Sequence, residues 1–337
     1  MRHILDRLIA TLNQGQAAIL CGIVRNYGSA PRTSGARMLV FADGSITGSV
    51  GGGALEGACC ARARQLLQDS ATFALLDFQL TAASAADEGM ACGGSASVLL
   101  QRLDPTMLPF FQRLQSEYQG GARPMLLTTL PQDQEGPSLR LIDSRENNDI
   151  TPEIRREITR KGRRAPFLLE TEGREIFVEP LIHPGTVHLA GAGHVALAVA
   201  VLADFVGFEI VVMDDRLEFA NRQRYPKARE VRVVPSFTDC IHSLGPDDYV
   251  VIVTRGHLHD RDVLAQALRT KAGYIGMIGS RRKRAAVYDS LRAEGFTDSD
   301  LARVHCPIGL AIDADTPEEI ALSIVAEMVQ TRGKMAT

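Results

Sequence analysis

The stretch from Val187 to Arg216 constrains the fold of this chain more than any other. It begins with a short apolar run, Val187–Ala190, which leads into a glycine-rich turn of sequence GAGHVA at 191–196. Apolar residues at helical spacing follow, and a second apolar run lies at Ile210–Met213. A strand, a G-x-G-x-x-A turn, a helix and a second strand in this order are typical of a nucleotide-binding βαβ unit.

Each polar position of this unit has an expected role. Gly191 permits the tight turn out of the strand, and Gly193 lets a phosphate approach the backbone at the helix N-terminus, where free N–H groups and the helix dipole favour an anion. A carboxylate that binds ribose is expected about 20 residues later, and Asp214 lies 23 residues after Gly191. We therefore predict that the nucleotide contacts Gly191, Gly193, His194, Asp214 and Asp215.

Strands and helices continue to alternate over residues 185–337. We expect strands at Glu230–Val233, Tyr249–Thr254 and Tyr274–Ile278, and a short helix at Ser236–Leu244. Strands separated by helices form a parallel sheet with helices on both faces. The sequence therefore predicts an α/β protein whose C-terminal domain is a Rossmann-like, doubly wound parallel sheet.

One polar turn carries Arg255, His257 and His259, and follows an expected strand. It should lie at the carboxyl edge of the sheet, where ligands of such folds bind. Two histidines with one nearby carboxylate, Asp260, make an incomplete metal site. We expect a polar wall of the cofactor site without a metal, although Asp260 also suits a helix cap.

A second polar turn on the same edge carries Ser280, Arg281 and Arg282, followed by Lys283 and Arg284. Cations are unfavourable at a helix N-terminus because the dipole is positive there. Four basic residues in the first helical turn therefore indicate a bound anion, and the alternative is a solvated basic face.

The N-terminal half contains a glycine loop at 48–53, and its candidate cofactor-binding residues are Ser49, Gly51, Gly52, Gly53 and Glu56. Glycines permit close approach of a ligand, and successive N–H groups at a helix start form an anion-binding nest. The alternative is a tight turn between a hairpin and a helix. Three consecutive glycines exceed what such a turn requires, so we favour a ligand loop.

Cys92 is the candidate reactive thiol, and Gly93 and Gly94 follow it at the mouth of an expected strand. A cysteine in an open, glycine-lined turn is accessible, and nearby N–H groups lower the pKa of its thiol. The alternative is a small buried apolar side chain. Cys59 and Cys60 lie within an expected helix, and we interpret them as packing residues.

Composition excludes several classes of protein. The 337 residues carry a net charge of −3, so the chain has no overall basic charge of the kind that indicates nucleic-acid binding. The apolar runs are too short or too interrupted to span a membrane. The N-terminus resembles an amphipathic helix with charges inside it, not an export signal. Six cysteines without a C-x-x-C pair are typical of reduced thiols, so we expect a cytoplasmic protein.

The chain is long enough for two domains. We expect an N-terminal α/β domain with a mixed sheet at 1–120, a charged extension and linker at 121–184, and the nucleotide-binding domain at 185–337. The charged segment 143–164 suits a solvated surface or a short exposed helix. Apolar stripes in the N-terminal helix and in residues 121–182 need partners, so we expect a homodimer.

Together these stretches resemble the XdhC/CoxI family, the accessory proteins that mature molybdenum hydroxylases such as xanthine dehydrogenase. The resemblance rests on GSVGGGALEG (48–57), GMACGGSASV (89–98), LAGAGHVA with VVMDDR (189–216), VTRGHLHD (253–260), and YIGMIGSRRKR with HCPIGLAIDADTPEEIALSI (274–324). These motifs span nearly the full chain in the order of the family.

The resemblance implies an N-terminal cofactor-associated domain and the function of a chaperone more than that of a stand-alone catalyst. Such proteins hold molybdenum cofactor, support its sulfuration by a cysteine desulfurase, and insert it into an apo-hydroxylase of the xanthine dehydrogenase or aldehyde oxidoreductase type. The cargo is molybdopterin or its cytosine dinucleotide form, and NAD(P) or another nucleotide is a further candidate for the Rossmann turn. Family members often carry a cysteine where this chain has Ala54. The absence of that thiol here makes Cys92 the stronger candidate for a reactive cysteine.

Two alternatives remain open at this point. The Rossmann fingerprint alone is compatible with an NAD(P)-dependent oxidoreductase, in which His257 or His259 acts as the acid–base residue. A non-catalytic scaffold would recruit the desulfurase without holding cofactor.

Overall fold

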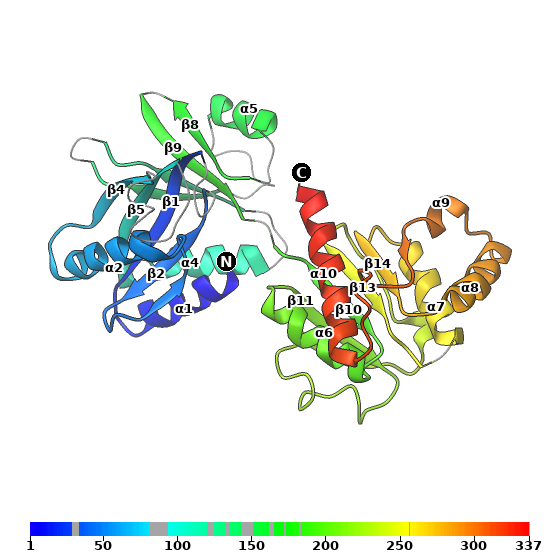
Figure 1. Cartoon of the computed structure of the whole chain (residues 1–337). Helices are drawn as coiled ribbons and strands as arrows, with labels where there is room; N and C mark the ends of the chain where they lie inside the picture. The colour runs from blue at the N-terminus through cyan, green and yellow to red at the C-terminus, as the bar shows by residue number, and fades with distance from the viewer. Residues whose placement is uncertain are drawn as a thin grey trace. The chain divides into compact units, whose positions relative to one another are not determined.

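The structure, a computed structural model, describes residues 1–28, 34–80, 94–119, 124–132, 135–142, 151–161, 165–171, 173–181, 183–255 and 257–336. They form two compact units, Met1–Ile182 and His183–Thr337 (Figure 1).

The elements of the first unit are α1 (Arg2–Asn13), β1 (Ala18–Gly28), β2 (Arg37–Phe41), β3 (Ile46–Gly48), α2 (Gly53–Gln68), β4 (Phe73–Leu80), β5 (Gly94–Leu103), the 3₁₀ turn η1 (Pro105–Met107), α4 (Leu108–Gln119), β6 (Met125–Thr129), β7 (Ser138–Ile142), α5 (Pro152–Lys161), β8 (Phe167–Thr171) and β9 (Arg174–Pro180).

The first unit is built on a five-stranded sheet of order β3-β2-β1-β5-β4. Alternate residues of a strand point to opposite faces. Leu20 therefore packs in one core with α1 and α4, while Ile19 and Cys21 pack in another with α2. The α/β prediction is confirmed, but the four strand pairs that build this sheet are antiparallel, not mixed.

The N-terminal helix uses its apolar stripe within its own unit. Leu5, Leu8 and Leu12 recur at helical spacing and are all buried beneath α4 and the sheet. Burial of each such side chain contributes roughly 1.5–3 kcal/mol. This stripe is therefore no reason to expect a homodimer.

Residues 124–181, expected as a charged extension and linker, contribute a four-stranded antiparallel sheet of order β7-β6-β9-β8 to the first unit. Within the charged segment 143–164, α5 forms a short helix that buries Ile154 and Ile158 against this sheet. Arg37 of β2 and Glu179 of β9 form a buried ion pair that joins the two sheets of the unit.

The second unit confirms the predicted doubly wound fold. Its elements are β10 (Thr186–Ala190), α6 (His194–Phe205), β11 (Glu209–Asp214), β12 (Glu230–Val233), the 3₁₀ turn η2 (Phe237–Asp239), β13 (Asp248–Ile252), α7 (His257–Leu268), β14 (Tyr274–Met277), α8 (Arg281–Ala293), α9 (Asp298–Leu301), β15 (Val304–His305) and α10 (Pro317–Ala336). Six parallel strands have the order β12-β11-β10-β13-β14-β15. This is the dinucleotide-binding order 3-2-1-4-5-6, in which the order reverses between the first and fourth strands.

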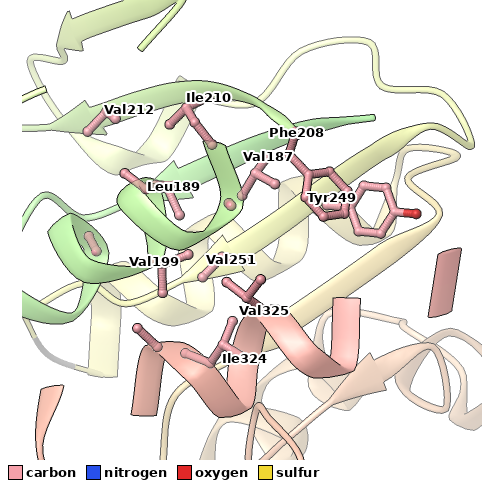
Figure 2. Packing of buried hydrophobic residues seen from close by; sticks show 14 of the residues in the cluster. Val187, Leu189, Val199, Phe208, Ile210, Val212, Tyr249, Val251, Ile324 and Val325 are labelled. Carbon is pink, nitrogen blue, oxygen red and sulfur yellow. The ribbon is translucent and has the colours of Figure 1, made fainter. Parts of the chain in front are cut away.

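Helices cover both faces of this sheet. Figure 2 shows one face, where Val187, Leu189 and Val251 pack against Val199 of α6 and Ile324 of α10. The other core lies beneath α7 and α8. No helix among the described residues is long and apolar enough to cross a membrane.

The prediction of a helix at Ser236–Leu244 is wrong, because the segment forms only the short 3₁₀ turn η2. The side chain of Gln266 accepts hydrogen bonds from the N–H groups of Cys240 and Ile241, at 2.8 and 2.9 Å. These N–H groups are the ones that would continue a helix from Ser236. A tertiary contact therefore overrides the local helical pattern.

Candidate functional site

The glycine turn after β10 lies where the strand order reverses. Gly191 has φ +106°, and a Cβ there would lie 2.5 Å from the carbonyl oxygen of Val253, just after β13. Its N–H donates to the carbonyl of Met213 in β11 at 2.8 Å. The turn is thus held tightly between both neighbouring strands, and only glycine fits at position 191.

Gly193 is different, because nothing lies within 4 Å of the position that its Cβ would occupy. It is the N-cap of α6, and the next residue, His194, is exposed. The first N–H groups of a helix have no partner within the helix. This open helix N-terminus therefore has the geometry and the polarity to bind a phosphate.

Asp214 ends β11 and is 1% exposed. Its carboxylate accepts from the N–H of Ala192 at 2.8 Å and from the N–H of Arg216 at 3.1 Å. The guanidinium of Arg216 adds two hydrogen bonds, at 2.8 and 3.0 Å. Burial raises the pKa of Asp214, but these donors outweigh it and hold the pKa below its usual value.

Asp214 therefore orders the turn from inside the protein. A ribose hydroxyl would have to compete with Arg216 for this carboxylate. Arg216 also lies over the ring of Phe219, with 3.7 Å between the guanidinium carbon and the ring centroid. Arg216 was not among the predicted site residues, although an arginine two residues after a strand-end aspartate is a usable signal.

Arg255 follows β13 and donates to both carboxylate oxygens of Asp215, at 2.8 and 3.1 Å. The pair is half-exposed and links the turns that follow β11 and β13. His257 begins α7. The ring of His259 packs against Phe237, with 5.2 Å between ring centroids, so His259 has a structural contact besides its predicted role.

Asp260, in the first turn of α7, is completely buried. It accepts a hydrogen bond from the hydroxyl of Thr254 at 2.6 Å and forms an ion pair with Lys283 of α8. Lys283 also donates to the carbonyl of Ile278 at 3.1 Å. This buried pair holds the starts of α7 and α8 together at the carboxyl edge.

Of the four basic residues at the start of α8, two make contacts within the protein and two are exposed. Ser280 caps the helix by accepting from the N–H of Lys283, and Arg284 donates to the carbonyl of Cys306 at 2.8 Å. Arg281 and Arg282 are exposed. Pairing of Lys283 with Asp260 relieves part of the repulsion from the helix dipole, so only two basic side chains remain as candidates for an external anion.

The glycine loop of the first unit binds a carboxylate of the chain itself. Oε1 of Glu56 accepts from the hydroxyl of Ser49 at 2.6 Å, from the N–H of Gly52 at 2.9 Å and from the N–H of Val50 at 3.2 Å. The Ser49 hydrogen bond is the main cause of a pKa for Glu56 below its usual value. The N–H of Gly51 donates to the Ser49 hydroxyl at 3.1 Å.

Gly51, Gly52 and Gly53 all have positive φ, a backbone conformation that glycine adopts readily and other residues rarely do. The anion in its nest is Glu56, and an external phosphate would have to displace that side chain. Cys92 and Gly93 lie outside the described residues. Gly94 begins β5, where it pairs with Gly28 and Leu80.

Comparison with known proteins assigns both units. Residues 11–79 match the "XdhC and CoxI family", and residues 187–328 match the "XdhC Rossmann domain". The two matches cover more than half of the chain, in family order. The chain belongs to the XdhC/CoxI family.

Relatives of this family member are similar along most of its length. It is 25% identical to a probable xanthine dehydrogenase subunit of Bacillus subtilis over 98% of this chain and 97% of that protein. It is 23% identical to the molybdenum cofactor insertion chaperone PaoD of Escherichia coli, over 98% and 88%. The uncharacterized protein YqeB of Escherichia coli is 28% identical over 92% of this chain. The chain spans only 42% of the length of that relative.

A solved structure agrees with the fold of this XdhC/CoxI protein. A crystal structure of a xanthine dehydrogenase from Bacillus halodurans superposes with a TM-score of 0.78 at 26% identity, covering 98% of this chain and 96% of that one.

Proposed function

We propose that this protein is a maturation factor for a molybdenum hydroxylase. In this proposal it binds molybdenum cofactor as cargo, supports its sulfuration by a cysteine desulfurase, and inserts it into an apo-hydroxylase of the xanthine dehydrogenase or aldehyde oxidoreductase type. The observation that carries the proposal is the pairing of an XdhC/CoxI unit with an XdhC Rossmann unit. The name of the relative PaoD, an insertion chaperone similar along nearly the whole chain, supports it.

The chemistry of the cargo fits one part of the second unit. Molybdopterin carries a phosphate, or a nucleotide diphosphate in its cytosine dinucleotide form. The open N-terminus of α6 at Gly193 offers backbone N–H groups to such an anion. Arg281 and Arg282, exposed at the same edge of the sheet, supply cations that a second phosphate favours.

The glycine loop needs a different role in this proposal. Because Glu56 already accepts three hydrogen bonds from it, the loop presents a carboxylate and a set of ordered turns, not free N–H groups. Ser49, Gly52 and Glu56 would then contact the pterin, whose ring nitrogens are hydrogen-bond donors to a carboxylate. Cys92 remains the proposed thiol for the metal–sulfur end.

Cofactor content tests the proposal most directly. The protein would be purified from a host that makes molybdenum cofactor, and bound pterin and molybdenum would be quantified. We expect Gly193→Val to lower the bound cofactor at least about tenfold, because its side chain fills the phosphate approach. Gly245→Ala, whose Cβ would meet nothing closer than 3.8 Å, is the matched control. Protein without pterin, and without effect on activation of an apo-hydroxylase, would overturn the proposal.

The sulfuration step has its own test. With a cysteine desulfurase, an L-cysteine supply and apo-hydroxylase present, we expect Cys92→Ser to lower hydroxylase activation while cofactor content stays unchanged. Unchanged activation would exclude a role of Cys92 and favour a scaffold that only recruits the desulfurase. Loss of cofactor and of activation together would assign Cys92 to binding.

A nicotinamide-dependent oxidoreductase is the second candidate, favoured by the strand order 3-2-1-4-5-6 around the glycine turn. The four hydrogen bonds on Asp214 weigh against it, since they leave no free acceptor for a ribose hydroxyl. Turnover of NAD(P)H that disappears in a His257→Ala or His259→Ala variant would favour this candidate over the first.

A further inference from the structure

The connection between β12 and β13 leaves part of one sheet face without a helix. The strand order β12-β11-β10-β13 requires this connection to cross β11 and β10. In doubly wound folds a helix normally fills that position. Residues 234–247 are all described, and η2 is their only helical turn. A hollow of about 310 Å³ lies between this connection and the sheet, and we call it the β10–β12 hollow.

The sheet beneath the β10–β12 hollow is polar, which is unusual for a parallel sheet. Both faces of such a sheet are normally covered, so its strands are mostly apolar. Thr186 of β10 is in register with Glu209 of β11 and Asp248 of β13, and His188 lies two residues further along β10. Thr186, His188 and Glu209 are buried. Because residues two apart in a strand point to the same face, these polar side chains gather beneath the hollow.

Asp248, the carboxylate that lines the hollow, already has its partners. Its Oδ1 lies 2.9 Å from Nε2 of His188, and its Oδ2 accepts from the N–H of Gly245 at 2.8 Å. Burial raises the pKa of Asp248, but these two contacts outweigh it and hold the pKa below its usual value. Asp248 therefore stays ionised and orients the imidazole of His188 in the wall of the hollow.

Two arginines in the wall of the hollow retain unused donors. Arg229 donates through Nη1 to Glu209 at 2.7 Å. Arg232 of β12 donates through Nε and Nη2 to Glu230, at 2.7 and 3.2 Å. A guanidinium has five N–H donors, so each arginine has more donors than its carboxylate partner uses. Two guanidiniums and one carboxylate among the lining residues make the hollow favourable for an anion.

The connection itself supplies the remaining wall of the hollow. His242 and the hydroxyl of Ser243 add hydrogen-bonding groups, while Ile241 and Leu244 add an apolar surface. Cys240 also lines the hollow, but burial raises the pKa of its thiol to about 11. The thiol is therefore neutral at physiological pH and does not repel an anion.

We propose that the β10–β12 hollow binds a small organic anion. Its phosphate or carboxylate group is held by Arg229 and Arg232, and its carbon atoms lie against Ile241 and Leu244. A volume of about 310 Å³ is at the lower end for ligand sites, which suits a sugar phosphate or a dicarboxylate.

This site is separate from the glycine turn of the second unit. Thr186 and Asp248 begin β10 and β13, so the hollow lies at the amino edge of the sheet. The open helix start at Gly193 follows β10 and lies at the carboxyl edge. Binding in the hollow therefore does not depend on whether the glycine turn holds molybdenum cofactor.

Histidine-ring NMR of the full chain tests the proposal, with inorganic phosphate, ribose 5-phosphate and malonate as probes. We expect at least one probe to shift the signals of His188 and His242 in a saturable way. Arg229→Gln and Arg232→Gln should each weaken this binding about tenfold or more, because each removes charge-assisted hydrogen bonds. The control is Arg292→Gln, since Arg292 is 49% exposed, as Arg229 is, and also pairs with a carboxylate.

A variant that fills the hollow separates a built site from loose attraction to surface charge. Ser243→Trp retains both arginines but occupies the hollow, and it should abolish the shifts of His188 and His242. Any shift of His194, at the carboxyl edge, should stay unchanged in this variant and in Arg229→Gln. Circular dichroism verifies that each variant is folded.

The three probes also distinguish the source of the anionic group. Tighter binding of ribose 5-phosphate than of malonate would assign the hollow to phosphate esters, and the reverse order to carboxylates. The absence of shifts at His188 and His242 with all three probes would overturn the proposal. Equal weakening in Arg292→Gln, or undiminished binding in Ser243→Trp, would overturn it as well.

Discussion

Two glycine-rich turns of this protein lead from a strand into a helix, yet they have different occupants. In the loop at 48–53, three donors converge on one oxygen of Glu56, so the chain fills its own anion nest. In the turn at 191–193, only the N–H of Ala192 is taken by a carboxylate, that of Asp214. The start of α6 at Gly193 stays open.

The two turns differ in the position of their carboxylate along the chain. Glu56 follows its glycines within the same helix, so its side chain reaches back to the loop as an acidic first-turn residue does. Asp214 ends the next strand, β11, and stabilises the turn by accepting a hydrogen bond from the N–H of Ala192 inside the protein. A glycine pattern therefore indicates a backbone able to bind an anion, while the nearest carboxylate decides whether an external anion finds free donors.

The largest expected effect separates the two glycines of the turn. Gly191→Ala should lower the free energy of unfolding of the second unit by about 3 kcal/mol or more, because φ is +106° and the new Cβ would meet a carbonyl oxygen at 2.5 Å. Gly193→Ala should change it by less than about 0.5 kcal/mol. Urea denaturation followed by circular dichroism measures both, and equal effects would contradict the contrast.

Asp214→Asn should cost about 2–3 kcal/mol at neutral pH, because it removes a buried charge from four hydrogen bonds. The pKa of Asp214 is lowered in the folded protein. Its contribution is therefore complete above the unfolded-state pKa of about 3.9 and is lost as pH falls through the lower folded-state pKa. Urea titrations at several pH values should show the wild type and the variant converging only in acid.

Removal of Glu56 should make the loop at 48–53 behave like the open turn. Glu56→Ala should lower the stability of the first unit by about 1 kcal/mol, as loss of a helix-start carboxylate does. It should also allow inorganic phosphate to shift the amide NMR signals of Gly51 and Gly52. Glu56→Gln retains an acceptor oxygen and should show a weaker response. Phosphate shifts as large in the wild type would show that Glu56 does not occupy the nest.

The smallest effect is expected for the exposed pair between Arg255 and Asp215. Arg255→Gln should change stability by less than about 0.5 kcal/mol, since exposed ion pairs contribute little. If Arg255 serves the site by its charge, phosphate should bind the variant a few times more weakly, in a titration that is sensitive to salt. An equal change in Arg174→Gln, in the other unit, would assign the effect to net charge alone.

Local patterns were enough to predict much of the second unit. The apolar runs predicted β10 and β11, and the required conformation of Gly191 followed from the fingerprint. The order of the six strands was beyond the sequence, because pairing depends on contacts between distant segments. Gln266 illustrates the same limit, since its contacts with Cys240 and Ile241 replace a predicted helix with a 3₁₀ turn.

The sequence was enough to predict which turns carry the candidate site residues, but not which side chains those residues contact. Residue types placed Arg255 and Ser280 correctly in turns after β13 and β14. The ion pair of Lys283 with Asp260 joins residues on two helices, and no spacing rule predicts it. Glu56 was singled out as a site residue, but its identity as the anion in its own loop required the folded backbone.

The contact between α6 and α10 also has a consequence for how the protein folds. The two helices touch, although well over a hundred residues separate them along the chain. Contacts of such high sequence separation form late, because the entropy of closing a long loop must be overcome first. During synthesis α6 therefore emerges long before the helix that shields its flank. A chain in this state exposes a continuous apolar helix, which makes the nascent second unit a target for chaperones and prone to aggregation until α10 has docked.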